Sequence, residues 1–306
     1  MKSFKNLLII MLTLIASLFI GCKKELEKIK VLLPSGAPLI AVGDLLDNEA
    51  FDFTIANGAD LLSASLITND FDMIIAPLNL GAKLHIAGKS NYKMAAVITT
   101  NNTYVISNEK LDTINDLKDK NILGYGQNST PDILLKAGLE KNNVIVAGIQ
   151  YQTSVADVMS LFMTGSEDAK YSLLAEPQLT KVKQKFPNVN VLNIAEEYGE
   201  NAIFPQACLF VNKNSEKDYE DYLELIEENV KYLNNKPTEY ANRIESKNEL
   251  FSSLTKEVLA IALPNCNINY ITAKDNKDIV NDYITLLNIY APKLLGGQTV
   301  NDEFYY

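Results

Sequence analysis

Short apolar runs alternate along the chain with segments in which apolar residues recur every three or four positions. The runs are rich in β-branched residues and end at turns, which is typical of buried strands, whereas the recurring segments have the spacing of amphipathic helices. Strands that alternate with helices predict an α/β fold with a largely parallel sheet. The expected strands are 29–33, 51–55, 73–76, 94–99, 103–107, 121–125, 144–151, 171–175, 189–192 and 207–211. The first helix expected between them begins near residue 39, and the others cover 60–68, 80–87, 111–117, 132–140, 155–164 and 179–186.

The same order of elements occurs twice. Strand, polar turn, helix, strand, helix, strand, proline-containing turn and helix follow one another from residue 29 and again from residue 121, without any repetition of sequence. This order predicts two similar α/β lobes. After residue 211 we expect the chain to be helical, over 219–234, 238–245, 255–262 and 277–290.

So long a helical tail cannot belong to the second lobe alone, and we expect it to return and pack on the first. The first lobe is then discontinuous, with residues 29–108 and 207–306, and the second lobe is 109–206. The chain would cross between the lobes near 106–109 and again near 206–211.

The N-terminal segment has the form of an export signal. Lys2 and Lys5 precede the apolar run Leu7–Ile20, and Gly21-Cys22 closes it. A run of about 14 residues is short for a membrane span but fits a cleaved signal. A small residue before a cysteine is typical of a lipoprotein processing site, although Phe19 stands where leucine is usual. We therefore expect a signal peptide over 1–21 and a tether over 22–28.

Processing at this site would make Cys22 the first residue and attach diacylglycerol to its thiol. Two acyl chains anchor a soluble domain firmly. The chain is then expected on the outer face of the cytoplasmic membrane. The alternative is an ordinary signal peptide or anchor, with Cys22 incidental.

Composition narrows the function classes. The chain has 306 residues and a net charge of −10, which disfavours nucleic-acid binding because such affinity comes mainly from neutralised phosphates. Cys208 and Cys266 have no metal-like spacing, so two buried free thiols are favoured over a disulfide. The single histidine, His85, lies on an expected helix surface. Because the motifs of metal, nucleotide and nucleophilic catalysis are absent from the sequence, we expect a binding protein without catalytic residues, metal or cofactor.

Four loops follow expected strands and open into helices, where ligands of parallel α/β sheets bind. They are Pro34-Ser35-Gly36-Ala37-Pro38, Ala76-Pro77-Leu78-Asn79-Leu80, Tyr125-Gly126-Gln127-Asn128-Ser129-Thr130-Pro131-Asp132 and Ala175-Glu176-Pro177-Gln178. In order and spacing they resemble the loops of nitrate/sulfonate/taurine-type ABC transporter substrate-binding proteins. The C-terminal segment, Gly296-Gly297-Gln298 to Asp302-Glu303-Phe304-Tyr305-Tyr306, resembles a lipoprotein branch of that family.

The resemblance spans the mature chain and implies a two-lobed type II periplasmic-binding fold with two crossover strands. It also implies a cleft that closes on a small solute, and ABC permease and ATPase subunits as partners. We expect a monomer. The residues expected to bind the solute are Ser35, Gly36, Ala37, Pro38, Pro77, Leu78, Asn79, Gln127, Asn128, Ser129, Thr130, Glu176 and Gln178.

The chemistry of these loops leaves alternatives open. Thr130 before Pro131 suits a helix N-cap, and Ser35 offers the same in the first lobe, so free N–H groups can hold an anionic group or simply cap. Gln127, Asn128 and Asn79 can donate and accept hydrogen bonds. Glu176 can pair with a ligand cation or cap its own loop. Tyr125 and Phe204 can stack on a ligand, although aromatic residues near strand ends usually belong to the core.

No arginine occurs in these loops, which disfavours a bidentate clamp on free phosphate or carboxylate. We therefore expect a small polar organic solute, zwitterionic or heterocyclic, in preference to nitrate. Two other functions use the same fold. One is an enzyme of the menaquinone or thiamine-pyrimidine biosynthesis type, with Glu176 or Asp132 abstracting a proton, and the other is a sensory solute-binding lipoprotein.

Overall fold

The computed structural model describes residues 26–306 except 57, 200, 248–250 and 252–253, and its strands form two sheets. The signal peptide and Cys22 lie outside the described residues. The first sheet contains β1 (Ile29–Pro34), β2 (Phe51–Ala56), β3 (Met73–Pro77), β4 (Tyr92–Thr100), β10 (Pro205–Asn212) and β11 (Ile268–Thr272). The second contains β5 (Tyr104–Ser107), β6 (Asn121–Tyr125), β7 (Gly148–Gln152), β8 (Tyr171–Leu174) and β9 (Asn190–Asn193).

The two sheets repeat one strand order. The first runs β11-β4-β10-β3-β1-β2 and the second β7-β6-β8-β5-β9, so that β2-β1-β3-β10-β4 corresponds to β7-β6-β8-β5-β9. β1 is parallel to β2 and β3, and β6 is parallel to β7 and β8. The fourth strand of each set, β10 or β5, is antiparallel to its neighbours and arrives from the other lobe. This topology confirms the predicted two-lobed fold with two crossovers.

The first crossover lies earlier than the sequence predicts. The chain leaves the first sheet after Thr100 and enters the second at Tyr104, so the strand expected over 103–107 is β5 of the second sheet. Apolar patterning identifies a strand but not its partner, and β5 is assigned by its pairing with β8 and β9. The chain returns between Asn193 and Pro205. The exact lobe boundaries, 108/109 and 206/207, stay predictions.

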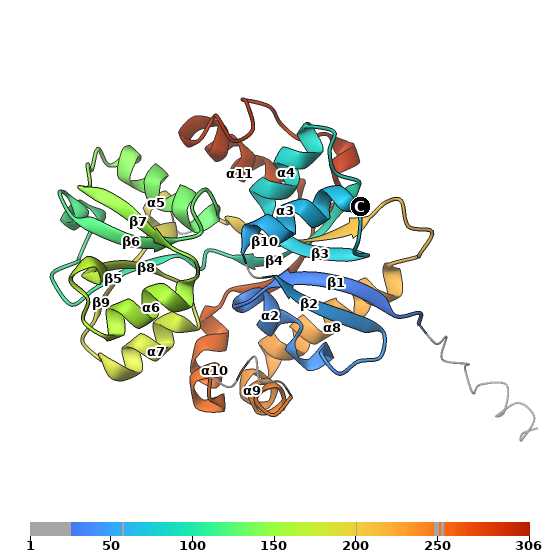
Figure 1. Cartoon of the computed structure of the whole chain (residues 1–306), viewed down its shortest axis with the longest axis horizontal. Coiled ribbons are helices and arrows are strands. Elements are labelled where there is room, and N and C mark those ends of the chain that lie inside the picture. The colour runs from blue at the N-terminus through green and yellow to red at the C-terminus, as the bar shows by residue number, and fades with distance from the viewer. Residues whose placement is uncertain (1–25, 57, 200, 248–250, 252–253) are drawn as a thin grey trace, which may run out of the picture.

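Helices cover both faces of each sheet (Figure 1). In the first lobe, α2 (Ala37–Ala41), α8 (Glu220–Asn235), α9 (Pro237–Glu245) and α10 (Lys256–Ala262) bury one apolar face. The opposite face is covered by α3 (Ala59–Thr68), α4 (Leu78–Ile86) and α11 (Lys277–Tyr290). The second lobe carries α5 (Thr130–Lys141), α6 (Val155–Met163) and α7 (Gln178–Lys185). Short 3-10 turns occur at Gly43–Leu45, Ile114–Leu117, Glu167–Ala169, Ile194–Tyr198, Leu263–Asn265 and Asp302–Phe304.

The core is continuous between the lobes. Residues of α4 and α11 share one buried cluster with residues of α5, and Phe204 lies in it against Tyr198 and Tyr283. The helical tail therefore packs on the first sheet, as expected, and α11 also contacts α5 of the second lobe. The close approach of α4 to β10 depends on Gly81, because a Cβ atom there would collide with the ring of Phe210.

Two elements differ from the sequence prediction. The tail is not wholly helical, because Ile268–Thr272 forms β11 on the edge of the first sheet, antiparallel to β4. The strand expected over 144–151 begins only at Gly148, since Asp119 N–H donates to Ile145 C=O and Ala147 N–H to Lys120 C=O in a loop instead. Both segments contain β-branched residues, so local pattern does not separate a short edge strand from a loop.

Several smaller expectations are tested by the structure. Cys208 and Cys266 are free and buried, and burial raises the pKa of both thiols. His85 lies on α4, where its Nε2 contacts Asn301 Oδ1 at 2.9 Å. Within the described residues, no helix is both long enough and apolar enough to cross a membrane.

Candidate functional site

The loops that follow β1, β3, β6 and β8 converge on one cavity of about 180 Å³ between the lobes. The two crossover segments complete its wall. Its lining residues are Pro34, Ser35, Gly36, Ala37, Pro38, Pro77, Thr99, Asn102, Tyr125, Ser129, Thr130, Pro131, Val155, Ala175, Glu176, Gln178, Gln206 and Ala207. Parts of all four loops expected from the sequence therefore meet here.

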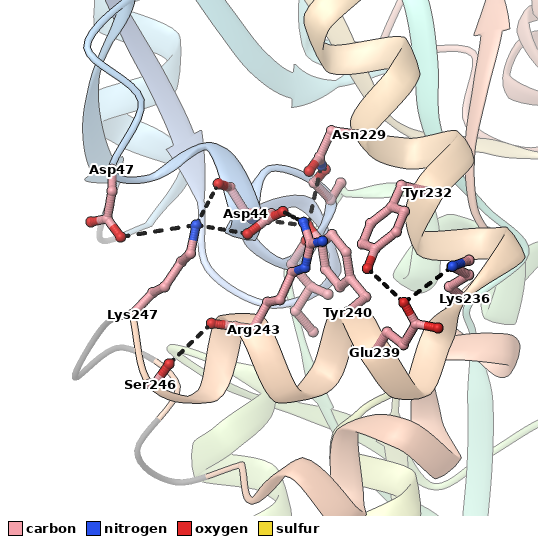
Figure 2. Close-up of polar contacts among 12 residues, drawn as sticks. Asp44, Asp47, Asn229, Tyr232, Lys236, Glu239, Tyr240, Arg243, Ser246 and Lys247 are labelled. Carbon is pink, nitrogen blue, oxygen red and sulfur yellow. Dashed lines mark hydrogen bonds and ion pairs between the residues drawn. The ribbon is translucent and has the colours of Figure 1, made fainter.

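The first-lobe side of the cavity is the turn between β1 and α2. Gly36 has φ of 85°, a left-handed conformation that glycine adopts without the strain a side chain would cause. The short helix that follows is fixed at its other end by side chains of the C-terminal helices (Figure 2). The Tyr240 hydroxyl donates to Ile40 C=O at 2.7 Å, and the Asn229 amide donates to Ala41 C=O and to the Tyr240 hydroxyl.

The second-lobe side is the start of α5. Its N-cap is Ser129, one residue earlier than expected, and Thr130 is the first helical residue. The Thr130 side chain is buried, and its hydroxyl donates to Pro205 C=O at 3.3 Å and accepts from the Tyr283 hydroxyl at 2.8 Å. The hydroxyl therefore joins α5 to a crossover and to α11, and only part of Thr130 faces the cavity.

Glu176 is buried at the start of α7. Its Oε2 accepts from Thr180 N–H at 2.9 Å, so the carboxylate does cap its own helix, and the residue also lines the cavity. Burial raises the pKa of the Glu176 carboxyl, although the hydrogen bonds from Thr180 and the charge of Lys183 act in the opposite direction. The main chain of Glu176 exchanges two hydrogen bonds with the Asn102 side chain, at 2.7 and 3.1 Å.

Sequence reasoning missed the contribution of the crossovers. Thr99, Asn102 and Gln206 line the cavity and hold the two crossovers together. Gln206 accepts from Asn102 N–H at 3.3 Å and donates to the Thr103 hydroxyl at 2.6 Å, and the Thr99 hydroxyl accepts from Ala207 N–H at 3.1 Å. The available signal was the polar stretch 101–103 between two apolar strands, which is unusual for a buried segment.

The two aromatic candidates have different positions. Tyr125 lines the cavity, and burial raises the pKa of its hydroxyl. Phe204 belongs to the core and does not line the cavity. Asp132, the other candidate acid, is fully buried, and its carboxylate accepts from Asn128 N–H, from Lys136 and from the Tyr151 hydroxyl at 2.6 to 2.8 Å.

Three expected residues form a second, outer cavity of about 330 Å³. Asn79, Gln127 and Asn128 line it, together with Pro77 and Ser129, which line both cavities. The Asn79 side-chain amide donates to Asn128 C=O at 2.8 Å and thereby bridges the two lobes. Leu78, which we also expected to contact a ligand, is completely buried in the core and lines neither cavity.

The described residues contain no cluster of histidine, cysteine, aspartate and glutamate side chains that could hold a metal ion. No protein-family model matches the chain, and no curated protein sequence is significantly similar to it. Comparison with solved structures, in contrast, gives matches over most of the chain.

Three of these structures illustrate the similarity. An ABC transporter protein from Parabacteroides distasonis matches with a TM-score of 0.76 and 22% identity, over 91% of this chain and 98% of its own. The periplasmic aliphatic sulphonate binding protein SsuA from Escherichia coli matches with 0.70 and 12%, over 92% of each chain. A zinc-bound ligand-binding component of an ABC-type import system from Staphylococcus aureus matches with 0.68 and 16%, over 92% of this chain and 97% of its own.

The strand order, the two crossovers and these matches together define the class of fold. The chain has the type II periplasmic-binding fold of ABC transporter substrate-binding proteins, of the kind that includes the sulphonate-binding proteins. Both cavities lie in the space between the two lobes.

Proposed function

We propose that this protein is the solute-binding component of an ABC importer and captures a small polar organic solute between its lobes. The observation that carries the proposal is the inner cavity, which is formed by loops at the carboxyl ends of parallel strands and by both crossovers. The chain itself connects the two lobes through the two crossovers, and hinge motion about these connections would open and close the cavity. The partners would be a permease and an ATPase, and the protein would act as a monomer.

The experiment that tests this function is thermal unfolding of residues 24–306 with a panel of sulfonates, thiamine precursors, riboflavin, amino acids, nucleobases and nitrate. A ligand that binds only the folded state, at a hundred times its dissociation constant, adds about 2.7 kcal/mol to the free energy of unfolding. For a protein of this size the midpoint would rise by about 4–5 °C. A shift with one chemical class supports solute binding, whereas tight binding of nitrate alone would contradict an organic solute.

We further propose that Cys22 carries a lipid anchor on the outer face of the cytoplasmic membrane. The proposal is supported by the lysines, the apolar run and the Gly21-Cys22 pair that precede the folded part of the chain. The variant Cys22→Ser should leave the signal uncleaved or release the protein from the membrane fraction. Membrane fractionation and mass spectrometry of the N-terminus measure this, and normal processing of the variant would contradict an anchor at Cys22.

The enzyme alternative is favoured by one observation, the buried Glu176 at the cavity wall. A carboxyl group whose pKa is raised by burial is the kind of group that transfers protons in closed sites. Prolonged incubation with a bound solute, followed by mass spectrometry, separates the functions because a binding protein returns the solute unchanged. A sensory role would instead retain binding without a transport partner.

A further inference from the structure

The inner cavity has one charged side chain among its described lining residues, and that side chain is an acid. Glu176 lies in the wall, whereas the described lining contains no lysine, arginine or histidine. The lysine whose charge acts on Glu176, Lys183, is exposed on α7 and does not line the cavity. When Glu176 is ionised, the fixed side-chain charge that the described lining presents to a ligand is therefore negative.

Several lining side chains that can donate are already occupied by protein acceptors. The Asn102 amide donates to Glu176 C=O, the Gln206 amide donates to the Thr103 hydroxyl, and the Thr130 hydroxyl donates to Pro205 C=O. Gln178 also lines the cavity, and its Oε1 is buried without a hydrogen-bond partner in the described structure. A buried acceptor without a partner costs stability unless a ligand supplies the missing donor.

Glu176 is held in place in the cavity wall by hydrogen bonds within the protein. The Asn102 side chain accepts from Glu176 N–H and donates to Glu176 C=O, and Thr180 N–H donates to Oε2 of the Glu176 carboxylate. Because the first crossover fixes the main chain of Glu176 and α7 fixes its carboxylate, a ligand that binds this group spends little free energy on ordering the site.

We propose that the solute presents a protonated nitrogen group, an ammonium or amidinium, to Glu176 and Gln178. The proposal rests on the proposed function and names the chemistry of its solute. A cation at this position would favour the ionised form of the carboxyl, against the effect of burial. Charge-assisted hydrogen bonds are about twice as strong as neutral ones, so an amine should bind tighter than the alcohol of the same shape.

The test uses pairs of compounds that differ only at one group: taurine with isethionate, and benzylamine with benzyl alcohol. Calorimetric titration of the protein measures each dissociation constant. We expect the amine of a pair to bind at least about tenfold tighter than its alcohol. In Glu176→Gln, which keeps an acceptor for Thr180 N–H, that preference should disappear, and in Gln178→Leu it should fall.

The matched control is Glu140→Gln, which makes the same change of charge on an exposed residue of α5. It should keep the amine preference of the wild type. Equal binding of both members of a pair, tighter binding of the alcohol, or an unchanged preference in Glu176→Gln would overturn the proposal while leaving solute binding intact. If no compound of either set, and none of the wider thermal panel, binds the wild-type protein, the proposed function fails and this proposal fails with it.

Discussion

At the residue scale, the ion pairs of Asp44 fix the end of α2, the short helix whose first residues line the inner cavity. Asp44 follows α2, and its carboxylate pairs with Lys247 at 2.7 Å and with Arg243 at 2.9 Å (Figure 2). Arg243 also lies over the ring of Tyr232, and the Asp44 main-chain N–H donates to the Tyr240 hydroxyl. The end of α2, and with it the Ser35–Pro38 turn, is thus attached to α9.

Asp44 makes the stability of the protein depend on pH in a defined direction. Burial alone would raise the pKa of Asp44, but the hydrogen bonds and charges of Lys247 and Arg243 outweigh it and lower the pKa below the usual 3.8. A carboxyl whose pKa is lowered on folding stabilises the protein above its unfolded pKa and loses that contribution as the pH falls through its folded pKa.

We predict that Asp44→Asn lowers the free energy of unfolding by about 1 kcal/mol at pH 7, as expected for a partly exposed ion pair. The difference from the wild type should shrink only below about pH 4. Urea denaturation at pH 7 and pH 3 measures it. Asp47→Asn is the matched control, because Asp47 is exposed and its Lys247 contact is 4.0 Å. A difference that is equal at both pH values would contradict this account.

Individual site residues were predictable where they stand in loops of recognisable composition. Ser35, Thr130 and Glu176 follow strand signals and precede helix signals, and the structure brings them to one cavity. For Asn102 the polar stretch 101–103 was a local signal, but its place in the wall beside Gln206 was not predictable, because it depends on pairing between residues about a hundred positions apart. Leu78 was misplaced for the opposite reason, since a residue at a strand-to-helix turn can face the core.

At the element scale, the contact between α5 and α11 joins the two lobes. The hydroxyls of Thr130 and Tyr283 form a buried bond, and Thr130 continues it to Pro205 C=O on the returning crossover. This contact changes what a substitution at Thr130 should do. The sequence predicts Thr130 to be a solute-binding residue, whereas the structure also gives its hydroxyl a stabilising role.

We predict that Thr130→Ala lowers the free energy of unfolding by about 1–3 kcal/mol, because it leaves two buried polar groups without a partner. Thr130→Ser keeps the hydroxyl and should lose much less. Denaturant unfolding of both variants and of Tyr283→Phe measures the effect. If the alanine variant is as stable as the serine variant, the buried bond contributes nothing.

Most elements were predictable from periodicity, and the exceptions have a physical cause. Long amphipathic segments such as α8 and α11 are recognisable in the sequence because several helical turns repeat the same apolar face. β11 is short and lies at a sheet edge, and β5 was found as a strand but assigned to the wrong sheet. Strand pairing is a long-range property, and one chain segment does not specify which other segment it will meet.

At the scale of the whole molecule, the lobes touch across the outer cavity through Asn79 and Asn128. Asn79 Oδ1, in contrast, is buried without a partner in the described structure. One neutral hydrogen bond contributes about 1 kcal/mol, so this contact by itself favours closure only weakly. A solute can tip such an equilibrium by the difference in its affinity for the two forms.

We predict that Asn79→Ala shifts the ligand-free protein toward an open form by about fivefold, equivalent to the loss of one hydrogen bond of about 1 kcal/mol. Small-angle X-ray scattering should then give a larger radius of gyration, which returns toward the wild-type value on addition of solute. Ser63→Ala, on the same rim, is the control. An unchanged radius in Asn79→Ala would mean that this bond does not influence closure.

The position of β10 also governs the order in which the molecule can be assembled during synthesis. β10 lies between β3 and β4, yet it is made only after the whole second sheet, whose strands are consecutive in the chain. Until residue 205 appears, a nascent chain therefore carries β3 with one edge unpaired and β4 without either of its neighbours. Unpaired edges invite pairing with other chains, so a truncation before β10 should leave a folded second lobe attached to an aggregating first half.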